Sequence, residues 1–421
     1  MEIKGNSLVK SFSVYTISGI LSAGIPFLIL PILTHHISTE DYGLLANYKV
    51  IFSLVMPLMG LSVAGALSRM YYERDKIDFP VYLSNGLILL LINSLVIGAI
   101  LFGFRATIFE LTQISSKWLL AALIISLGYN ISLMILTIWR LQNRSFSFGV
   151  LNVFRSLLNF GFSLFFVITL LHSWKGRIEG ELIAVLFFAV LSVWFLYKGK
   201  WLKFKLSKKY IKDILQFGLP LIPHSLGAVI IAFSDRILIT KYVGLSSTGL
   251  YAVGSQVAAI LLILFSSFIL AWIPWLYEKL KKNNSEDKKK IVKITYSYFA
   301  ILFLLAVLLQ LFAPVLFRIF IGEEFQTAQT FISWLVFGLA FNGMYRIVVP
   351  YLFYLKKTYI VGIVSISVAI LNIGLNILLI NRSGAIGAAQ ATCVSFLLQF
   401  LIIWFISGKQ FKMPWFSAFK K

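Results

Sequence analysis

Long apolar runs alternate with short polar segments along nearly the whole chain, from Val9 to Ser407. Each run holds about 20 residues, enough for a helix to cross the roughly 30 Å hydrocarbon core of a bilayer. Val81–Phe104 and Tyr359–Ile380 are two examples. The helices of a water-soluble protein have one polar and one apolar face, whereas these runs are apolar on all sides. The pattern therefore predicts an all-α protein that crosses a membrane many times.

The apolar runs predict about twelve transmembrane helices, each close to the length that a bilayer requires. Their expected ranges are 11–33, 44–66, 82–104, 117–138, 150–171, 178–197, 214–240, 248–273, 293–317, 328–350, 359–380 and 385–407. The first run exceeds the core of a signal peptide, so we expect it to be retained as a span.

A weak internal repeat indicates that the spans form two similar halves. GLLA at 43–46 and GLYA at 249–252 each open an apolar span, which is followed by a tyrosine among charged residues at Tyr72 and Tyr277. Halves with six spans each insert in the same orientation, as in transporters with a symmetry axis along the membrane normal. We expect two six-helix bundles related by a pseudo-twofold axis, at 1–200 and 214–421, with a basic cytoplasmic linker at 201–213.

The distribution of charge decides between two kinds of partner. The chain is 59% hydrophobic and carries a formal net charge of +22, which alone could suggest a nucleic acid partner. Its lysines and arginines, however, gather in the polar segments that lie on one side of the predicted membrane. This asymmetry follows the positive-inside rule and predicts a cell-membrane protein with both termini in the cytoplasm. It argues against nucleic acid.

The longest inner segment, WLKFKLSKKYIKDI at 201–214, allows two interpretations. Its lysines and aromatic residues suit a basic helix on an anionic lipid leaflet. The favoured interpretation is a loop whose positive charge sets the membrane topology.

Proline pairs interrupt the first span of each predicted half. Pro26 and Pro31 lie in the first span, and Pro220 and Pro223 lie in the seventh. Proline removes a backbone donor and kinks a helix, and in a membrane the freed carbonyls need protein or water as partners. We therefore expect a bent helix in each half.

Four basic side chains lie inside predicted spans: Lys49, Arg155, Arg236 and Arg346. Such residues usually face the interior of a bundle or a cavity, because their burial in lipid costs at least about 2.5–3.5 kcal/mol. They could instead extend to the lipid headgroups where an interface is near. For Lys49, Arg155 and Arg346 both interpretations stay open. Arg236 stands deeper in its span, so we predict that it lines a cationic cavity.

Asp235 is the acid that we assign to the interior of a span, while Glu179 and Glu181 are assigned to outer loops. Asp235 could pair with a basic residue on a neighbouring helix or bind a coupling proton or Na⁺, and the pairing is favoured. His224, beside the proline break, is a second candidate for either role. No HExxH motif or cysteine cluster is present, so no metal site is predicted.

The sequence holds no motif of a catalytic site. It has no GxSxG elbow, no P-loop and no pair of acids in a sizeable loop. We therefore expect a protein that is not an enzyme and that does not hydrolyse ATP.

Several segments resemble the polysaccharide-transporter family, the O-antigen flippases of the Wzx type. They are FGLPLIPHSLGAVIIAFSDRILITKYVGLSSTGLYAVGSQ at 217–256, ILTHHISTEDYGLLANYKVIFSL at 32–54, AWIPWLYEKL at 271–280 and SGAIGAAQATCVS at 383–395. The family belongs to the multidrug/oligosaccharidyl-lipid/polysaccharide (MOP) exporters. The resemblance extends over the whole chain, and FSDRIL followed by GLYA is its most distinctive part.

The resemblance implies a MATE-like fold of two six-helix bundles around a central cavity that opens alternately to each side. It implies a flippase that moves undecaprenyl-diphosphate-linked oligosaccharides, for O-antigen, lipopolysaccharide or capsule, to the outer leaflet without a cofactor. Membrane lipids, a polysaccharide polymerase and glycosyltransferases would be its partners. Arg236 is the first residue carried over as a substrate contact, and Arg155 and Arg346 are carried over by charge type.

Two alternatives remain. A multidrug/cation antiporter of the same fold would favour acidic residues in the cavity, whereas this chain has mainly basic ones. A membrane glycosyltransferase or ligase would need catalytic residues in a large outer loop, and the predicted outer loops are short.

Overall fold

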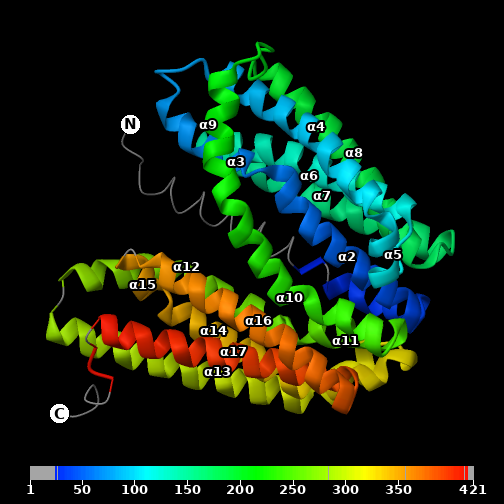
Figure 1. The fold of residues 1–421 in the computed structure, drawn as a ribbon, viewed down its shortest axis with the longest axis vertical. Coiled ribbons are helices and arrows are strands. Elements are labelled where there is room, and N and C mark those ends of the chain that lie inside the picture. The colour runs from blue at the N-terminus through cyan, green and yellow to red at the C-terminus, as the bar shows by residue number, and fades with distance from the viewer. Residues whose placement is uncertain (1–23, 26, 283, 356, 412, 416–421) are drawn as a thin grey trace. The chain divides into compact units, whose positions relative to one another are not determined.

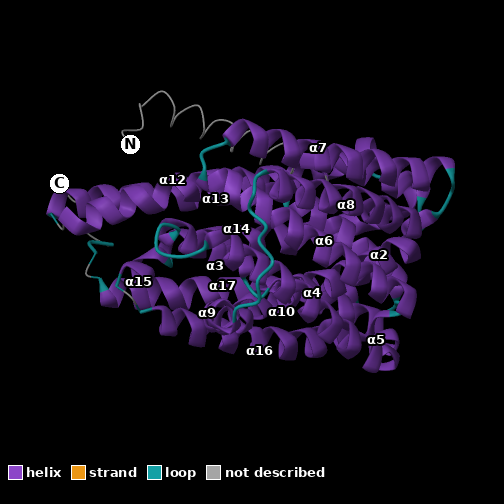
Figure 2. Ribbon diagram, turned by 90° about the horizontal axis from the view of Figure 1, so that it is seen from above, coloured by secondary structure: helices purple, strands orange, loops and turns teal. Residues whose placement is uncertain are grey.

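All regular structure in the described part of the chain is helical (Figures 1 and 2). The structure is a computed structural model that describes residues 24–25, 27–282, 284–355, 357–411 and 413–415. By its packing the chain separates into two compact units, Met1–Val229 and Ile230–Lys421. The packing thus divides the chain inside one helix, α10, and the bundle boundaries expected from the sequence stay a prediction.

The N-terminal unit contains a short apolar helix, Phe27–His36, and eight labelled α-helices before α10. These are α2 (Thr39–Gly60), α3 (Val63–Met70), α4 (Phe79–Gly103), α5 (Arg105–Thr112), α6 (Ser116–Leu141), α7 (Ser145–Leu164), α8 (Ser173–Lys198) and α9 (Lys208–Gly218). A 3₁₀ turn at Tyr71–Glu73 follows α3, and a π-helical turn at Phe165–Thr169 ends α7. A second 3₁₀ turn, Leu219–Leu221, joins α9 to α10 (Ile222–Tyr242).

The C-terminal unit contains most of α10 and seven further α-helices. These are α11 (Leu245–Ala258), α12 (Ile260–Lys282), α13 (Ser285–Phe320), α14 (Ile332–Val348), α15 (Pro350–Tyr354), α16 (Thr358–Ser383) and α17 (Ala385–Gln410). A 3₁₀ segment, Glu323–Phe331, leads into α14.

Within the described residues, ten helical segments are long and apolar enough to cross a membrane. They correspond to ten of the predicted spans, and α10 covers most of the seventh. Most of the first predicted span, 11–33, lies outside the described residues. Pro26, within this span, also lies outside them. The prediction of a polytopic, all-α membrane protein is therefore confirmed.

Several helices begin before the apolar run that predicted them, because a polar residue caps the N-terminus. The Ser38 side chain accepts a hydrogen bond from the Asp41 backbone N–H and starts α2 at Thr39, where the apolar run predicted a start at 44. Asn284 likewise caps α13, which begins at Ser285 and not at 293. Hydropathy marks the part of a helix in hydrocarbon, and caps mark where the helix begins.

Two predicted spans are each divided into two helices. The range 214–240 contains the end of α9, the turn with Pro220, and α10 with Pro223 at its second position. The range 248–273 is wrong as one continuous helix, because α11 ends at Ala258 and α12 begins at Ile260. No proline lies at this second break, so the apolar pattern did not indicate it.

Small residues allow the helices of each unit to approach closely. A Cβ atom on Gly128 of α6 would lie 2.4 Å from Val185 Cγ1 of α8. In the C-terminal unit a Cβ atom on Gly338 of α14 would lie 3.1 Å from the Cα atom of Cys393 in α17. Cys393 is buried at this contact and serves as a small packing residue.

The segment from Gly199 to Gly218 is fastened along the N-terminal unit. The Ser84 hydroxyl accepts a hydrogen bond from the Lys203 backbone N–H at 2.8 Å. Asn85 of α4 donates to the Lys205 carbonyl at 2.8 Å and accepts from the Ser207 backbone N–H at 2.9 Å. The segment predicted to be a linker, 201–213, is therefore held against α4 by hydrogen bonds.

Gly218, the last residue of α9, lies against the backbone of the N-terminal unit. A Cβ atom at this position would stand 1.9 Å from the Leu61 carbonyl oxygen. We expect Gly218→Ala to lower the free energy of unfolding by about 1–3 kcal/mol. The clash is with a backbone oxygen, which cannot be relieved by a change of side-chain rotamer. Thermal unfolding of the purified protein measures this.

Gly227→Ala in α10 is the matched control. Its Cβ atom would meet nothing within 4 Å, so alanine should leave stability unchanged or raise it by up to about 1 kcal/mol. Equal melting temperatures for the two variants would contradict the close approach of α9 to Leu61.

Candidate functional site

A polar cavity of about 290 Å³ lies inside the N-terminal unit. Three helices supply its polar lining: Tyr129 from α6, Arg155, Ser156 and Asn159 from α7, and Arg177 and Glu181 from α8. Ile25 and Ile29 close it on another side. Such a set of charged and hydrogen-bonding groups within apolar spans marks this cavity, which we call the Arg155 cavity, as a candidate functional site.

An ion pair organises one wall of the Arg155 cavity. Arg177 and Glu181 are one turn apart on α8, with a guanidinium nitrogen 3.4 Å from Glu181 Oε2. Arg177 also donates to Asn159 Oδ1 at 2.8 Å and to Ser163 Oγ at 2.9 Å. The Tyr129 hydroxyl donates to Glu181 Oε1 at 2.8 Å. These bonds link α6, α7 and α8 and fix the orientation of the polar groups.

Arg155 is held differently. Its guanidinium donates to Asn152 Oδ1 at 3.0 Å and lies over the Tyr129 ring, 5.0 Å from the ring centroid. Among the described residues no carboxylate lies within ion-pair distance of Arg155. With Arg177 and Glu181 forming a pair, the positive charge of Arg155 is the excess charge of the cavity. Anions are the ligands that such an excess favours.

A second polar cluster surrounds Asp235 in the C-terminal unit. The Asp235 side chain, 2% exposed, accepts hydrogen bonds from the hydroxyls of Tyr251 and Thr392, the latter at 2.7 Å. Asn376 Nδ2 donates to the other carboxylate oxygen at 2.9 Å. Helices α10, α11, α16 and α17 thus meet around one buried carboxylate, and these three donors are uncharged.

The hydrogen-bond chain extends from Asn376 along α16 and α17. Asn376 Nδ2 also lies 3.1 Å from Asn372 Oδ1, and Asn372 donates to Ser395 Oγ at 3.2 Å. Asn376 Oδ1 is buried and has no hydrogen-bond donor within the part of the chain that the structure describes. A buried acceptor without a partner is costly. The Asp235 cluster therefore contains an oxygen that a bound cation could use.

The other basic residues of the predicted spans lie in different surroundings. Arg236 is half-buried, with its guanidinium 4.9 Å from the Phe233 ring centroid and 5.8 Å from that of Tyr251. Arg346 of α14 is exposed and donates to Asn342 Oδ1 at 3.0 Å. Lys49 is half-buried in α2, ten residues after Thr39, so it lies deeper in its helix than the apolar run indicated.

The remaining predicted residues are placed only by the backbone or by local contacts. His224 lies in the first turn of α10, and its side chain is outside the described part of the structure. Pro31 lies within the short helix Phe27–His36, and its carbonyl accepts a hydrogen bond from Thr34 Oγ1 at 3.0 Å.

The structure corrects the assignment of acids to spans. Glu179 and Glu181 fall within the predicted range 178–197 and lie inside α8, which begins at Ser173 and is long and apolar enough to span a membrane, so their assignment to an outer loop is wrong. Asp235 is therefore not the one acid within the spans. The spacing of Arg177 and Glu181, four residues apart at the start of an apolar run, was the available signal for an intrahelical ion pair.

The apolar helices of the described residues define a multi-pass membrane protein, and its fold is MATE-like by comparison with solved structures. Residues 8–280 match the family described as polysaccharide biosynthesis protein. The match covers more than half of the chain, so the chain belongs to this family.

Other known proteins resemble this chain in sequence or in fold. The Lsg locus putative protein 1 of Haemophilus influenzae is 26% identical over 365 residues, covering 84% of this chain and 86% of its own length. An inward-facing multidrug resistance MATE family transporter of the MOP superfamily superposes with a TM-score of 0.71 at 15% identity, covering 94% of both chains. The lipid II flippase MurJ, in an inward closed conformation, superposes with a TM-score of 0.70 at 18% identity, covering 94% of this chain and 87% of MurJ. At such identities the two structures show a shared fold.

Proposed function

We propose that this protein is a flippase for undecaprenyl-diphosphate-linked oligosaccharides, the repeat units of a surface polysaccharide such as O-antigen or capsule. It moves them from the cytoplasmic to the outer leaflet of the cell membrane without chemical change. Membership of the polysaccharide biosynthesis family supports the pathway. The observation that carries the proposal is the Arg155 cavity, a site with excess positive charge inside an apolar unit.

The physical task explains why such a cavity is needed. A diphosphate with attached sugars cannot cross hydrocarbon unaided, because burying charged and polar groups without partners is prohibitive. Arginine binds phosphate and carboxylate groups through paired N–H donors. Arg155 supplies such donors, while Asn159, Ser156 and Glu181 can exchange hydrogen bonds with sugar hydroxyls. We propose that Arg236, Arg346 and Lys49 also contact the anionic substrate during transport.

Orientation and partners follow from the same proposal. The excess of lysine and arginine on one side supports an orientation with both termini in the cytoplasm, where glycosyltransferases would complete the substrate. A polysaccharide polymerase would consume the product on the outer side. Alternating access would open the transport path to one side of the membrane at a time.

We also propose that the Asp235 cluster holds a coupling cation, either a proton or Na⁺. The carboxylate supplies the charge, and Asn376 Oδ1, which has no donor among the described residues, supplies a further oxygen when the amide flips and Oδ1 replaces Nδ2 beside the carboxylate. Carboxylate and carbonyl oxygens within broken membrane helices are a recurrent setting for such ions. The competing role is a structural one, in which Asp235 only joins the four helices.

The experiment that tests the flippase is a gene deletion followed by analysis of the lipid-linked glycans. We expect completed repeat units to accumulate on undecaprenyl diphosphate, accessible from the inner side, and surface polysaccharide to be lost. A plasmid-borne copy should reverse both effects. Incomplete repeat units would indicate a glycosyltransferase instead. Normal surface polysaccharide together with drug hypersensitivity would indicate a multidrug antiporter of the same fold.

A further inference from the structure

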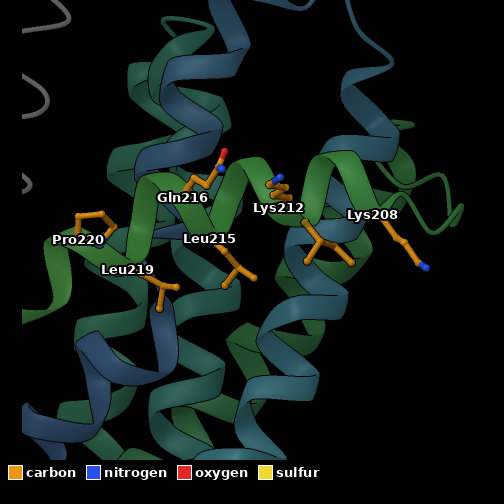
Figure 3. Close-up of a pocket in the computed structure, with 7 residues that line it drawn as sticks. Lys208, Lys212, Leu215, Gln216, Leu219 and Pro220 are labelled. Atoms are coloured by element: carbon orange, nitrogen blue, oxygen red, sulfur yellow. The ribbon is translucent and has the colours of Figure 1, made fainter.

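A second cavity, of about 520 Å³, opens along one face of α9 in the N-terminal unit (Figure 3). Two parallel rows of side chains line it, each with the four-residue spacing of one helix face. Lys208, Lys212 and Gln216 form the polar row, and Ile211, Leu215 and Leu219 form the apolar row. In Figure 3 Leu215 and Leu219 project from the same side of α9. We call this feature the α9 groove.

The opposite face of α9 is anchored, so the α9 groove has a fixed orientation on the N-terminal unit. Ile214 and Gly218 are buried against neighbouring helices. Asp213 accepts hydrogen bonds from Arg69 of α3 at 2.5 Å and from the Tyr82 hydroxyl of α4 at 2.7 Å. The anchoring leaves Leu219 50% exposed at one end of the groove.

The anchoring also separates the charges of α9. Burial raises the pKa of Asp213, but the hydrogen bonds from Tyr82 and Arg69 outweigh burial and hold the pKa below its usual value. Asp213, the one acid in the α9 sequence, is thus ionised and paired with Arg69 on the anchored side. The groove side carries Lys208 and Lys212, both exposed. The helix N-terminus beside Lys208 adds partial positive charge.

The chain just before α9 has the character of a membrane-facing segment. Phe204 and Leu206 are 68% and 65% exposed and alternate with lysines. Aromatic and aliphatic side chains between lysines suit the boundary between headgroups and acyl chains. The basic end of the α9 groove therefore lies where the headgroup of a membrane lipid would stand, with the apolar row leading away from it.

We propose that the α9 groove is a docking site for the isoprenoid-diphosphate end of the lipid-linked substrate, at which the substrate is held before translocation. This proposal rests on the proposed function. Lys208 and Lys212 are about 6 Å apart along the helix axis, so one diphosphate can contact both ammonium groups. The single apolar row is one side chain wide, which suits one isoprenoid chain better than the two chains of a phospholipid.

Binding measurements on the purified, full-length protein in phosphatidylcholine nanodiscs test this site. The probes are farnesyl diphosphate, which has both the chain and the diphosphate, and inorganic diphosphate, which lacks the chain. We expect Lys208→Gln/Lys212→Gln to weaken farnesyl diphosphate binding at least tenfold. Leu219→Ser should weaken farnesyl diphosphate binding and leave inorganic diphosphate binding unchanged.

Lys209→Gln is the matched control, because Lys209 is exposed on the same helix but does not line the groove. It should bind as the unmodified protein does. Unchanged binding by the Lys208/Lys212 double variant would overturn the proposal. Displacement of farnesyl diphosphate by an equal concentration of phosphatidylglycerol in the nanodiscs would also overturn the proposal. It would indicate an ordinary phospholipid site.

The outcomes separate this proposal from the proposed function. If the lysines bind farnesyl diphosphate but the deletion strain makes normal surface polysaccharide, the flippase proposal fails and the lipid site stands. If the deletion traps completed repeat units and the double variant still restores surface polysaccharide fully, the flippase stands and the α9 groove is not its docking site.

Discussion

Asp235→Asn should reduce transport at least tenfold while the protein still inserts and folds. Asparagine keeps the size of the side chain but removes the negative charge that a coupling proton or Na⁺ requires. The measurement is transport of a lipid-linked oligosaccharide in proteoliposomes, at several Na⁺ concentrations and pH values. The dependence on one of these ions should be present in the unmodified protein and absent in the variant.

Thr392→Val is the control that separates coupling from packing. It removes one hydrogen bond to Asp235 and retains both the carboxylate and the shape of the side chain. Loss of a buried hydrogen bond costs about 1–3 kcal/mol, so its melting temperature should fall while the ion dependence persists. If Asp235→Asn transports normally, with the same ion dependence, Asp235 is a structural residue that joins helices.

Arg155→Ala should also reduce transport at least tenfold, with little loss of stability. The Arg155 side chain makes a hydrogen bond to Asn152 and a ring contact with Tyr129, and it has no carboxylate partner among the described residues. Removing it therefore leaves no acid unpaired. Arg155→Lys should retain part of the activity, because the charge remains and the paired N–H geometry is lost. Transport and thermal unfolding are measured on the same preparations.

Two other arginines give the contrasts for this experiment. Arg177→Ala should lower the melting temperature, since it leaves Glu181 without its ion pair inside the unit. Arg105→Ala, at an exposed residue that stacks on the Phe102 ring, should be near neutral in both measurements. Full transport by Arg155→Ala would remove the Arg155 cavity from the substrate path.

The spans could be predicted from the sequence because each depends on a continuous stretch of apolar residues. Phe79–Gly103 and Ala385–Gln410 lie within a few residues of their predicted ranges. The break between Ala258 and Ile260 was missed, since neither proline nor glycine marks it. Helix starts were placed late where a cap such as Asn284 lies several residues before the apolar run.

The candidate sites were predictable only as single residues. Arg155 and Asp235 stand out in the sequence because charge is rare in apolar spans. Their partners, Tyr129 and Thr392, are ordinary residues in membrane helices and come from segments far away in the chain. The Arg155 cavity depends on how α6, α7 and α8 pack, which a pattern along one helix cannot specify.

Hydrogen bonds to α3 and α4 fix the number of residues that the chain needs between Ser207 and Asp213. Asn85 fixes the position of Ser207, and Arg69 and Tyr82 fix the direction of Asp213, six residues later. One extra residue between these two fixed points would rotate everything after it by about 100° around the helix axis. Asp213 would then turn away from Arg69, and Leu215, Gln216 and Leu219, which follow it, would no longer face the side that the groove now occupies. In this part of the chain, therefore, substitutions that keep the count are a smaller disturbance than any insertion or deletion.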